Sequence, residues 1–231
     1  MTAWDVFYKQ FITYEGYKEV LNGLRATALI AVLGLIIGIV IGTLIAISKV
    51  VPQNNPFVKI WAGISDLYTW FFRGTPMVVQ LLIFYFILFP SFGIKVDKLI
   101  VAIAAFGLNS GAYVSEIMRS GILSVDKGQM EAARSLGLGY TPSMVSVVLP
   151  QAVKNILPTL GNEFITLVKE TSVVSFIAVV DLTKAFRSIG DATYEYVIPY
   201  LMLAAVYLVI VSLITLLVRA IERRMRKSER R

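Results

Sequence analysis

Two uncharged segments constrain this chain more than any other feature of its sequence. Ala26–Ile47 and Val197–Val218 each run for 22 residues without a charged side chain. A helix of that length can cross a hydrocarbon layer of about 30 Å. The composition agrees, because 57% of the 231 residues are hydrophobic and only 16% are charged, whereas a soluble domain carries about 25% charged residues. The sequence therefore predicts an integral membrane protein.

Further apolar segments give a count of the crossings. Gly74–Pro90 and Leu99–Ser115 are uncharged over 17 residues each. A fifth apolar segment, from 155 to 180, is interrupted by the charged side chains of Glu163, Lys169 and Glu170. The simplest fold class is an all-α integral membrane protein with about five transmembrane helices, whose N- and C-termini lie on opposite sides of the membrane.

The chain divides into three parts. Residues 1–21 lack the basic-then-apolar layout of a signal peptide, and their aromatic side chains favour a segment at the membrane interface. Residues 22–222 hold the apolar segments as one transmembrane domain. Residues 223–231 form a basic tail, which is typical of a topology anchor at the lipid surface.

The placement of the basic residues predicts the orientation. Cytoplasmic flanks of membrane proteins carry an excess of Lys and Arg. With five crossings, 13 of the 22 Lys and Arg residues lie on the side of the C-terminus and 7 on the other side. We therefore expect the C-terminus and the loop at about 119–154 to be cytoplasmic and the N-terminus to lie outside.

Missing residue types exclude several kinds of chemistry. The sequence contains no Cys and no His, which rules out disulfides, thiolate nucleophiles, Cys/His metal sites and His-based proton relays. The remaining Asp, Glu and Lys residues show no spacing that would build a catalytic set. The GxxxxGK[ST] phosphate-binding loop is also missing. We expect a chain that is not an enzyme and that holds no metal and no cofactor of its own.

The predicted cytoplasmic loop contains a short helix with clear ends. The segment Lys127–Leu136 favours a helix, and Gly137 and Gly139 stop it. A short helix that is bounded by breaks on both sides suits docking into a groove of a partner protein.

This loop resembles the EAA loop of ABC importer permeases. The shared residues are Glu131-Ala132-Ala133, then Gly137, then Val147 in place of the usual Ile, and Leu149-Pro150. The resemblance implies a type I ABC importer transmembrane fold, in which the loop forms a coupling helix that seats in a cleft of a separate ATPase. The coupling residues that it implies are Glu131, Ala132, Ala133, Arg134 and Gly137.

Further motifs resemble the polar amino-acid permeases within that family, from about residue 20 to residue 222. They include Phe72-Arg73-Gly74-Thr75-Pro76, Asn109-Ser110-Gly111-Ala112-Tyr113, Gly161-Asn162-Glu163-Phe164 and Lys169-Glu170-Thr171-Ser172. The resemblance implies one subunit of an ATP-driven amino-acid importer in a prokaryotic cell membrane. Its partners would be an ABC ATPase dimer that binds ATP and Mg, a second permease subunit of the same or a related kind, and an extracytoplasmic amino-acid-binding protein. No nucleic-acid partner is expected.

Polar side chains inside the apolar segments indicate a substrate path. An ionisable group within a membrane is costly, so it marks either a pathway or a buried pair. At the helical rise per residue, Asn109 and Glu163 both lie about 15 Å from the predicted cytoplasmic edges of their segments, near the midplane where transporter sites occur. We predict a substrate pocket formed by Asn109, Ser110 and Glu163. The alternative is that Glu163 pairs with Lys169 or Arg73 and never meets substrate.

Asp66 and Arg73 are weaker candidates for the same pocket. The segment Pro56–Pro90 would be about 51 Å long as one helix, too long for a straight crossing, and Gly74-Thr75-Pro76 offers a break. Asp66 then lies either near the midplane or near the cytoplasmic surface. Arg73 either binds a substrate carboxylate or balances a buried acid, and the second interpretation is preferred.

The charge of Glu163 suggests the substrate. An ionised carboxylate that faces the path would attract a cation, so a basic L-amino acid such as arginine, lysine or histidine is the leading hypothesis. A neutral polar amino acid such as glutamine is the alternative. An ion-coupled secondary carrier is less favoured, because such carriers are commonly built from internal repeats and this sequence has none that we can detect.

Two other patterns predict packing rather than binding. Gly34, Gly38 and Gly42 recur at every fourth position of the first long segment, which permits close approach of another helix. Glu116 lies three residues before Arg119, a spacing that favours a local ion pair on a helix.

Overall fold

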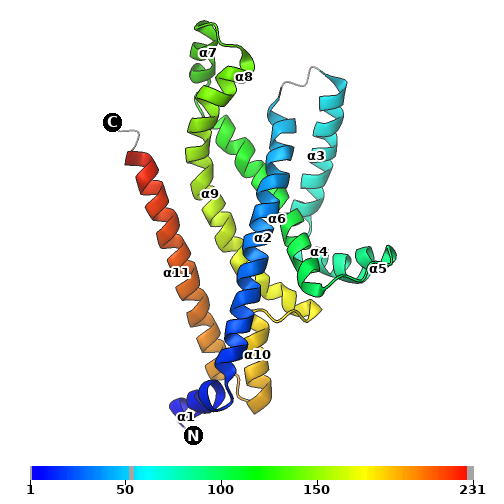
Figure 1. Ribbon diagram of the computed structural model, residues 1–231, viewed down its shortest axis with the longest axis vertical. Helices are drawn as coiled ribbons and strands as arrows, with labels where there is room; N and C mark the ends of the chain where they lie inside the picture. The colour runs from blue at the N-terminus through cyan, green and yellow to red at the C-terminus, as the bar shows by residue number, and fades with distance from the viewer. Residues whose placement is uncertain (1, 52–54, 228–231) are drawn as a thin grey trace.

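The chain is helical throughout the part that the structure describes, residues 2–51 and 55–227 (Figure 1). The computed structural model assigns these residues to the α-helices α1 (Ala3–Phe7), α2 (Gly16–Val50), α3 (Pro56–Gly74), α4 (Met77–Ile83), α5 (Phe89–Ser91), α6 (Lys98–Leu123), α7 (Lys127–Ser135), α8 (Tyr140–Ser143), α9 (Leu149–Glu170), α10 (Leu182–Thr193) and α11 (Val197–Lys227). Short π-helical segments occur at Tyr8–Thr13, Phe84–Leu88 and Met144–Val148, and a 3-10 helix at Thr171–Ile177. No strand occurs in the described ranges, which confirms the all-α class.

Three of the described helices are long and apolar enough to cross a membrane: α2, α6 and α11. A fourth crossing results if α3 is counted together with the segment Met77–Ser91, which we call the α4–α5 limb. α9 is not in this set, although its 22 residues rise about 33 Å. The predicted crossing at 155–180 is not one continuous helix, because α9 ends at Glu170 and a 3-10 helix follows.

A sharp bend separates α3 from α4. The axis of α3 and the axis of the α4–α5 limb differ by 108°, and Figure 1 shows this limb running across the direction of α3. Thr75 and Pro76 between the helices are extended, and Pro76 has no N–H with which to continue the helical hydrogen bonds. The predicted break is confirmed. The apolar segment 74–90 therefore does not form a straight crossing by itself.

α2 is the central helix of the fold. It contacts α3, α6, α9 and α10. Gly34, Gly38 and Gly42 are buried against α6, and a Cβ atom added to Gly38 would lie 2.6 Å from the Oγ atom of Ser110. Only glycine allows the two backbones to approach this closely, so the predicted packing stripe is confirmed.

The molecule has two distinct ends. α1 and α10 lie at one end, while α7 and α8 lie at the other, and α11 runs toward the α7 end (Figure 1). A capping box between Thr2 and Asp5 starts α1. α2 begins at Gly16, six residues before the predicted start of the transmembrane domain at residue 22, and the interfacial position of the N-terminal segment stays a prediction.

Candidate functional site

Glu163 lies where three helices meet. The hydroxyl of Ser110, on α6, donates to the Oε1 atom of Glu163, on α9, over 3.1 Å. Gly38 of α2 packs against the same hydroxyl, and Ser110 is fully buried. Within the described ranges, Glu163 has no cationic partner, so the alternative pairing with Lys169 or Arg73 is not found there.

Asn109 faces away from Glu163, although the sequence predicts one pocket that contains both Asn109 and its neighbour Ser110. Its Nδ2 atom donates to the Oε1 atom of Gln80 over 2.9 Å and to the carbonyl oxygen of Phe72 over 3.3 Å. Adjacent residues on a helix point in directions about 100° apart. The structure therefore brings Ser110 and Glu163 together and places Asn109 beside the bend between α3 and α4.

Arg73 borders an open cavity of about 580 Å³. The cavity lies between the end of α3, the second half of α6 and α9, and its lining includes Tyr113, Ser120, Ser124, Asn155 and Thr159. The guanidinium of Arg73 lies 5.6 Å from the ring centroid of Tyr113, in a cation–π contact. Among the described residues, Arg73 makes no ion pair, so the preferred expectation of a balanced buried acid is not met there.

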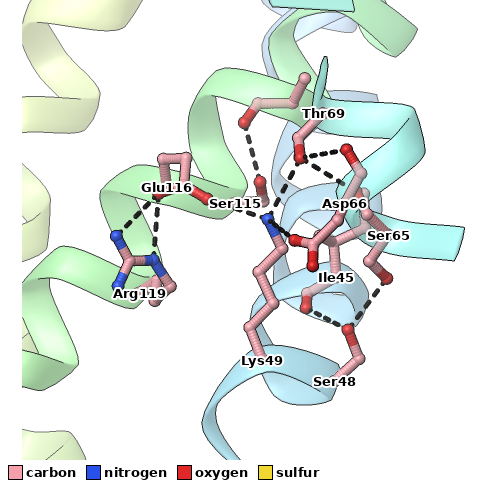
Figure 2. A network of polar contacts seen from close by, with 10 residues as sticks. Ile45, Ser48, Lys49, Ser65, Asp66, Thr69, Ser115, Glu116 and Arg119 are labelled. Carbon is pink, nitrogen blue, oxygen red and sulfur yellow. Dashed lines mark hydrogen bonds and ion pairs between the residues drawn. The ribbon is translucent and has the colours of Figure 1, made fainter. Parts of the chain in front are cut away.

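A charged network joins α2, α3 and α6 next to this cavity (Figure 2). The Nζ atom of Lys49 lies 3.1 Å from Oδ1 of Asp66 and 3.0 Å from Oε1 of Glu116. The other carboxylate oxygen of Glu116 contacts Arg119 at 3.0 Å, which confirms the predicted local pair. Because Lys49 is in the last turn of α2, Asp66 lies toward the α7 end of the molecule rather than at mid-height.

Hydroxyl groups of α2 and α3 add further hydrogen bonds beside these ion pairs. Lys49 Nζ also donates to the hydroxyl of Thr69 over 3.1 Å, and the hydroxyls of Ser48 and Ser65 are 2.9 Å apart. The Lys49 side chain is only 10% exposed, whereas Asp66 is 71% exposed. Among the four charged side chains, the charge of Lys49 is therefore the least solvated by water, and it depends most on its protein partners.

Lys49→Met is expected to destabilise the protein by about 1–2 kcal/mol, because charged hydrogen bonds contribute about 1.5–3 kcal/mol. The loss stays below that of a fully buried pair, since Glu116 keeps Arg119 and Asp66 is open to water. Thermal unfolding of the purified protein checks this. Lys59→Met, at an exposed position of α3, is the matched control, and equal unfolding temperatures for the two variants would contradict the prediction.

The predicted coupling residues lie on α7 and in the turn that follows it. Asp126 caps α7 by accepting a hydrogen bond from the backbone N–H of Gly128 over 2.7 Å. Gly137 adopts a φ of +90°, a conformation that favours glycine, and so ends the helix where the sequence predicts. Ala133 is buried within the loop. The other predicted coupling residues are exposed: Glu131, Ala132, Arg134 and Gly137.

The turn after α7 exposes a large apolar side chain. Leu136 is 85% exposed, and Leu138 is 41% exposed. The turn between α7 and α8, which holds both residues, lies at one end of the molecule (Figure 1). The same loop is tied to the central helix, because the hydroxyl of Tyr140 donates to the carbonyl oxygen of Val50, the last residue of α2, over 3.4 Å.

The sequence motifs do not predict two polar residues that the structure places in these sites. Gln80 is 1% exposed within an otherwise apolar segment. Lys49 follows the first apolar segment, where it counts only as one of the basic residues that predict the orientation. A polar side chain inside a crossing is the signal that could have found Gln80. Lys49 could not be found, because its partner Glu116 is 67 positions away in sequence.

The fold and these sites define a helical membrane permease. The chain belongs to the family of binding-protein-dependent transport system inner membrane components, which it matches over residues 34–227.

Curated relatives narrow the class of transported molecule. The arginine transport system permease protein ArtQ of Bacillus subtilis is 42% identical over 91% of this chain and 94% of its own length. A putative glutamine transport system permease protein GlnP of Rickettsia bellii is 41% identical over 89% of this chain and 92% of its own length. The chain is accordingly an amino-acid ABC importer permease, a transporter subunit rather than an ATPase.

Solved structures agree with the fold. A chain of an amino acid ABC transporter crystallised with histidines superposes with a TM-score of 0.84 at 40% identity, covering 93% of this chain and 98% of that one. A chain of the MetNI methionine ABC transporter superposes with a TM-score of 0.71 at 18% identity, covering 92% and 96%. The expected type I importer fold is confirmed.

Proposed function

We propose that this permease carries a basic L-amino acid, such as arginine, lysine or histidine, past Glu163. The carboxylate of Glu163 is tied to Ser110 and has no cation beside it in the described part of the chain. A carboxylate with no counter-ion in a largely apolar setting attracts a cation strongly. The arginine permease among the relatives and the transporter solved with histidines support this choice.

Arg73 supplies the complementary charge in this proposal. Its guanidinium borders the cavity without an acidic partner among the described residues, and a guanidinium fits a carboxylate group in a bidentate manner. Arg73 would bind the α-carboxylate of the substrate, and Glu163 with Ser110 would bind the cationic end. Asp66 has a smaller role, because Lys49 already neutralises it.

The proposed partners follow from the same argument. α7 and the exposed Leu136 would dock on a separate ABC ATPase dimer, which binds ATP and Mg. A second permease subunit, most simply a second copy of this chain, would complete the path, because a single chain with so few crossings is too small to enclose it. An extracytoplasmic amino-acid-binding protein would deliver the substrate at the α1–α10 end, in a prokaryotic cell membrane with a cytoplasmic C-terminus.

Glu163→Gln is expected to raise the KM for uptake of a basic amino acid about 10- to 100-fold in a reconstituted complex. The reason is the loss of a charge-assisted contact worth about 1.5–3 kcal/mol. Uptake of glutamine should change less, since it carries no side-chain charge. Glu19→Gln, an exposed position of α2, is the control. Normal uptake of basic amino acids by Glu163→Gln would refute the proposed role of Glu163 in binding the substrate cation.

Neutral glutamine is the second candidate substrate, because several relatives carry names for glutamine transport. In that case Glu163 would accept a hydrogen bond from the substrate amide or amino group. Direct binding of arginine, lysine, histidine and glutamine to the purified complex separates the two candidates, since only one class should bind with high affinity.

A further inference from the structure

The bend between α3 and α4 leaves a backbone carbonyl without its helical partner. In a continuous helix, the N–H of residue 76 would bind the carbonyl oxygen of Phe72. Proline at position 76 has no N–H to donate. Phe72 is 7% exposed, so water cannot easily replace the missing donor, and an unpaired backbone group in an apolar environment is costly.

Two buried side-chain amides fill this gap. Gln80 Nε2 donates to the carbonyl oxygen of Phe72 over 2.8 Å and to that of Thr75 over 2.9 Å. Asn109 Nδ2 donates to the same Phe72 oxygen over 3.3 Å and to Gln80 Oε1 over 2.9 Å. Gln80 is 1% exposed and Asn109 is 4% exposed. The amides thus connect the end of α3, the start of α4 and the middle of α6.

The same part of α6 also contacts Arg73, which lies at the end of α3. Asn109 and Tyr113 are four residues apart, so they lie on one face of the helix. Asn109 binds the carbonyl of Phe72, and Tyr113 stacks against the guanidinium of the next residue, Arg73. The direction in which Arg73 enters the cavity therefore depends on how the end of α3 is fixed to α6.

We propose that Gln80 and Asn109 are positioning residues, which hold the bend between α3 and α4 and thereby aim Arg73 into the cavity. This inference rests on the proposed binding of the substrate carboxylate by Arg73. Neither amide touches the substrate in this scheme. Asn109 thus acts on binding through Arg73, instead of lining the pocket beside Glu163.

A double-mutant cycle tests the link to Arg73. In the purified permease–ATPase complex, Asn109→Ser, which is too short to reach the carbonyl of Phe72, should raise the Kd for L-arginine about two- to tenfold. In an Arg73→Gln background the same change should have no further effect. Gln80→Leu should behave in the same way. Equal weakening by Asn109→Ser in both backgrounds would overturn the proposal.

A distance measurement tests the bend independently of substrate. The chain has no Cys, so spin labels can be placed at Leu67→Cys on α3 and Ile87→Cys beyond α4, both exposed positions. With each labelled chain diluted among unlabelled ones, the distance distribution should be narrow, and Gln80→Leu or Asn109→Ser should broaden it. Lys59→Ala, an exposed position of α3, serves as the control and should leave it narrow.

The two measurements separate the possible failures. If Arg73→Gln leaves the Kd unchanged while the amide variants broaden the distances, the carboxylate role of Arg73 fails and the amides hold only the bend. If the distances stay narrow in both amide variants, the inference itself is overturned, whatever Arg73 does.

Discussion

Glu131→Lys is expected to abolish coupled transport while leaving the permease folded. Glu131 is exposed on α7 and makes no ion pair within the described residues, so its replacement costs the fold little. If α7 docks on an ATPase, the reversed charge opposes a surface that complements the native one. A docking loss of at least about 1.4 kcal/mol corresponds to a tenfold loss of affinity.

The measurement is ATP-driven uptake together with co-purification of the ATPase. Lys95→Glu reverses another exposed charge, in the loop before α6, and should leave both unchanged. Leu136→Asp is a second variant in the same region, and it should weaken docking because Leu136 is the most exposed apolar side chain of the turn after α7. Full coupling in both Glu131→Lys and Leu136→Asp would refute the assignment of α7.

Gly38→Val is expected to have the largest effect on stability. Even the first carbon of a new side chain would lie 2.6 Å from the Oγ atom of Ser110 and 3.1 Å from its backbone carbon. Because α2 and α6 form the centre of the fold, they cannot separate without loss of packing, and overpacking costs about 1–3 kcal/mol or more. The displaced hydroxyl is the one that binds Glu163, so substrate binding should also weaken.

Gly63→Val is the matched control for this prediction. A Cβ atom at Gly63 would meet nothing within 4 Å, and α3 gains a residue with a higher helix propensity than glycine. Thermal unfolding in detergent should therefore show a much lower transition for Gly38→Val than for Gly63→Val. Similar transitions would mean that α2 and α6 are not packed as closely as described.

The sequence predicts the fold well where the physical signal is local. The uncharged segments 26–47 and 197–218 lie within α2 and α11, and the glycine stripe faces α6. The bend at Gly74-Thr75-Pro76 is also predictable, because proline acts on its own helix. The end of α9 at Glu170 is not, since the apolar pattern continues through the 3-10 helix that follows.

The contact partners of the polar side chains could not be predicted from the sequence. The depth of Asn109 and Ser110 follows from helical rise, but their partners depend on which helices pack on each face. Ser110 meets Glu163 from α9, and Asn109 meets Gln80 from α4. The partner of Lys49 likewise depends on the crossing of α2 and α6. These are long-range contacts, which a single sequence does not encode locally.

The unbroken length of α2 has a mechanical consequence. Its 35 residues span about 52 Å, and its last carbonyl is bonded to Tyr140 in the loop after α7. A rigid rod of that length acts as a lever: a tilt of about 5° at one end displaces the other by about 4.5 Å. The loop after α7 and the α1–α10 end are therefore geometrically linked: if α2 tilts as one body about its α7 end, its other end must move by several ångströms.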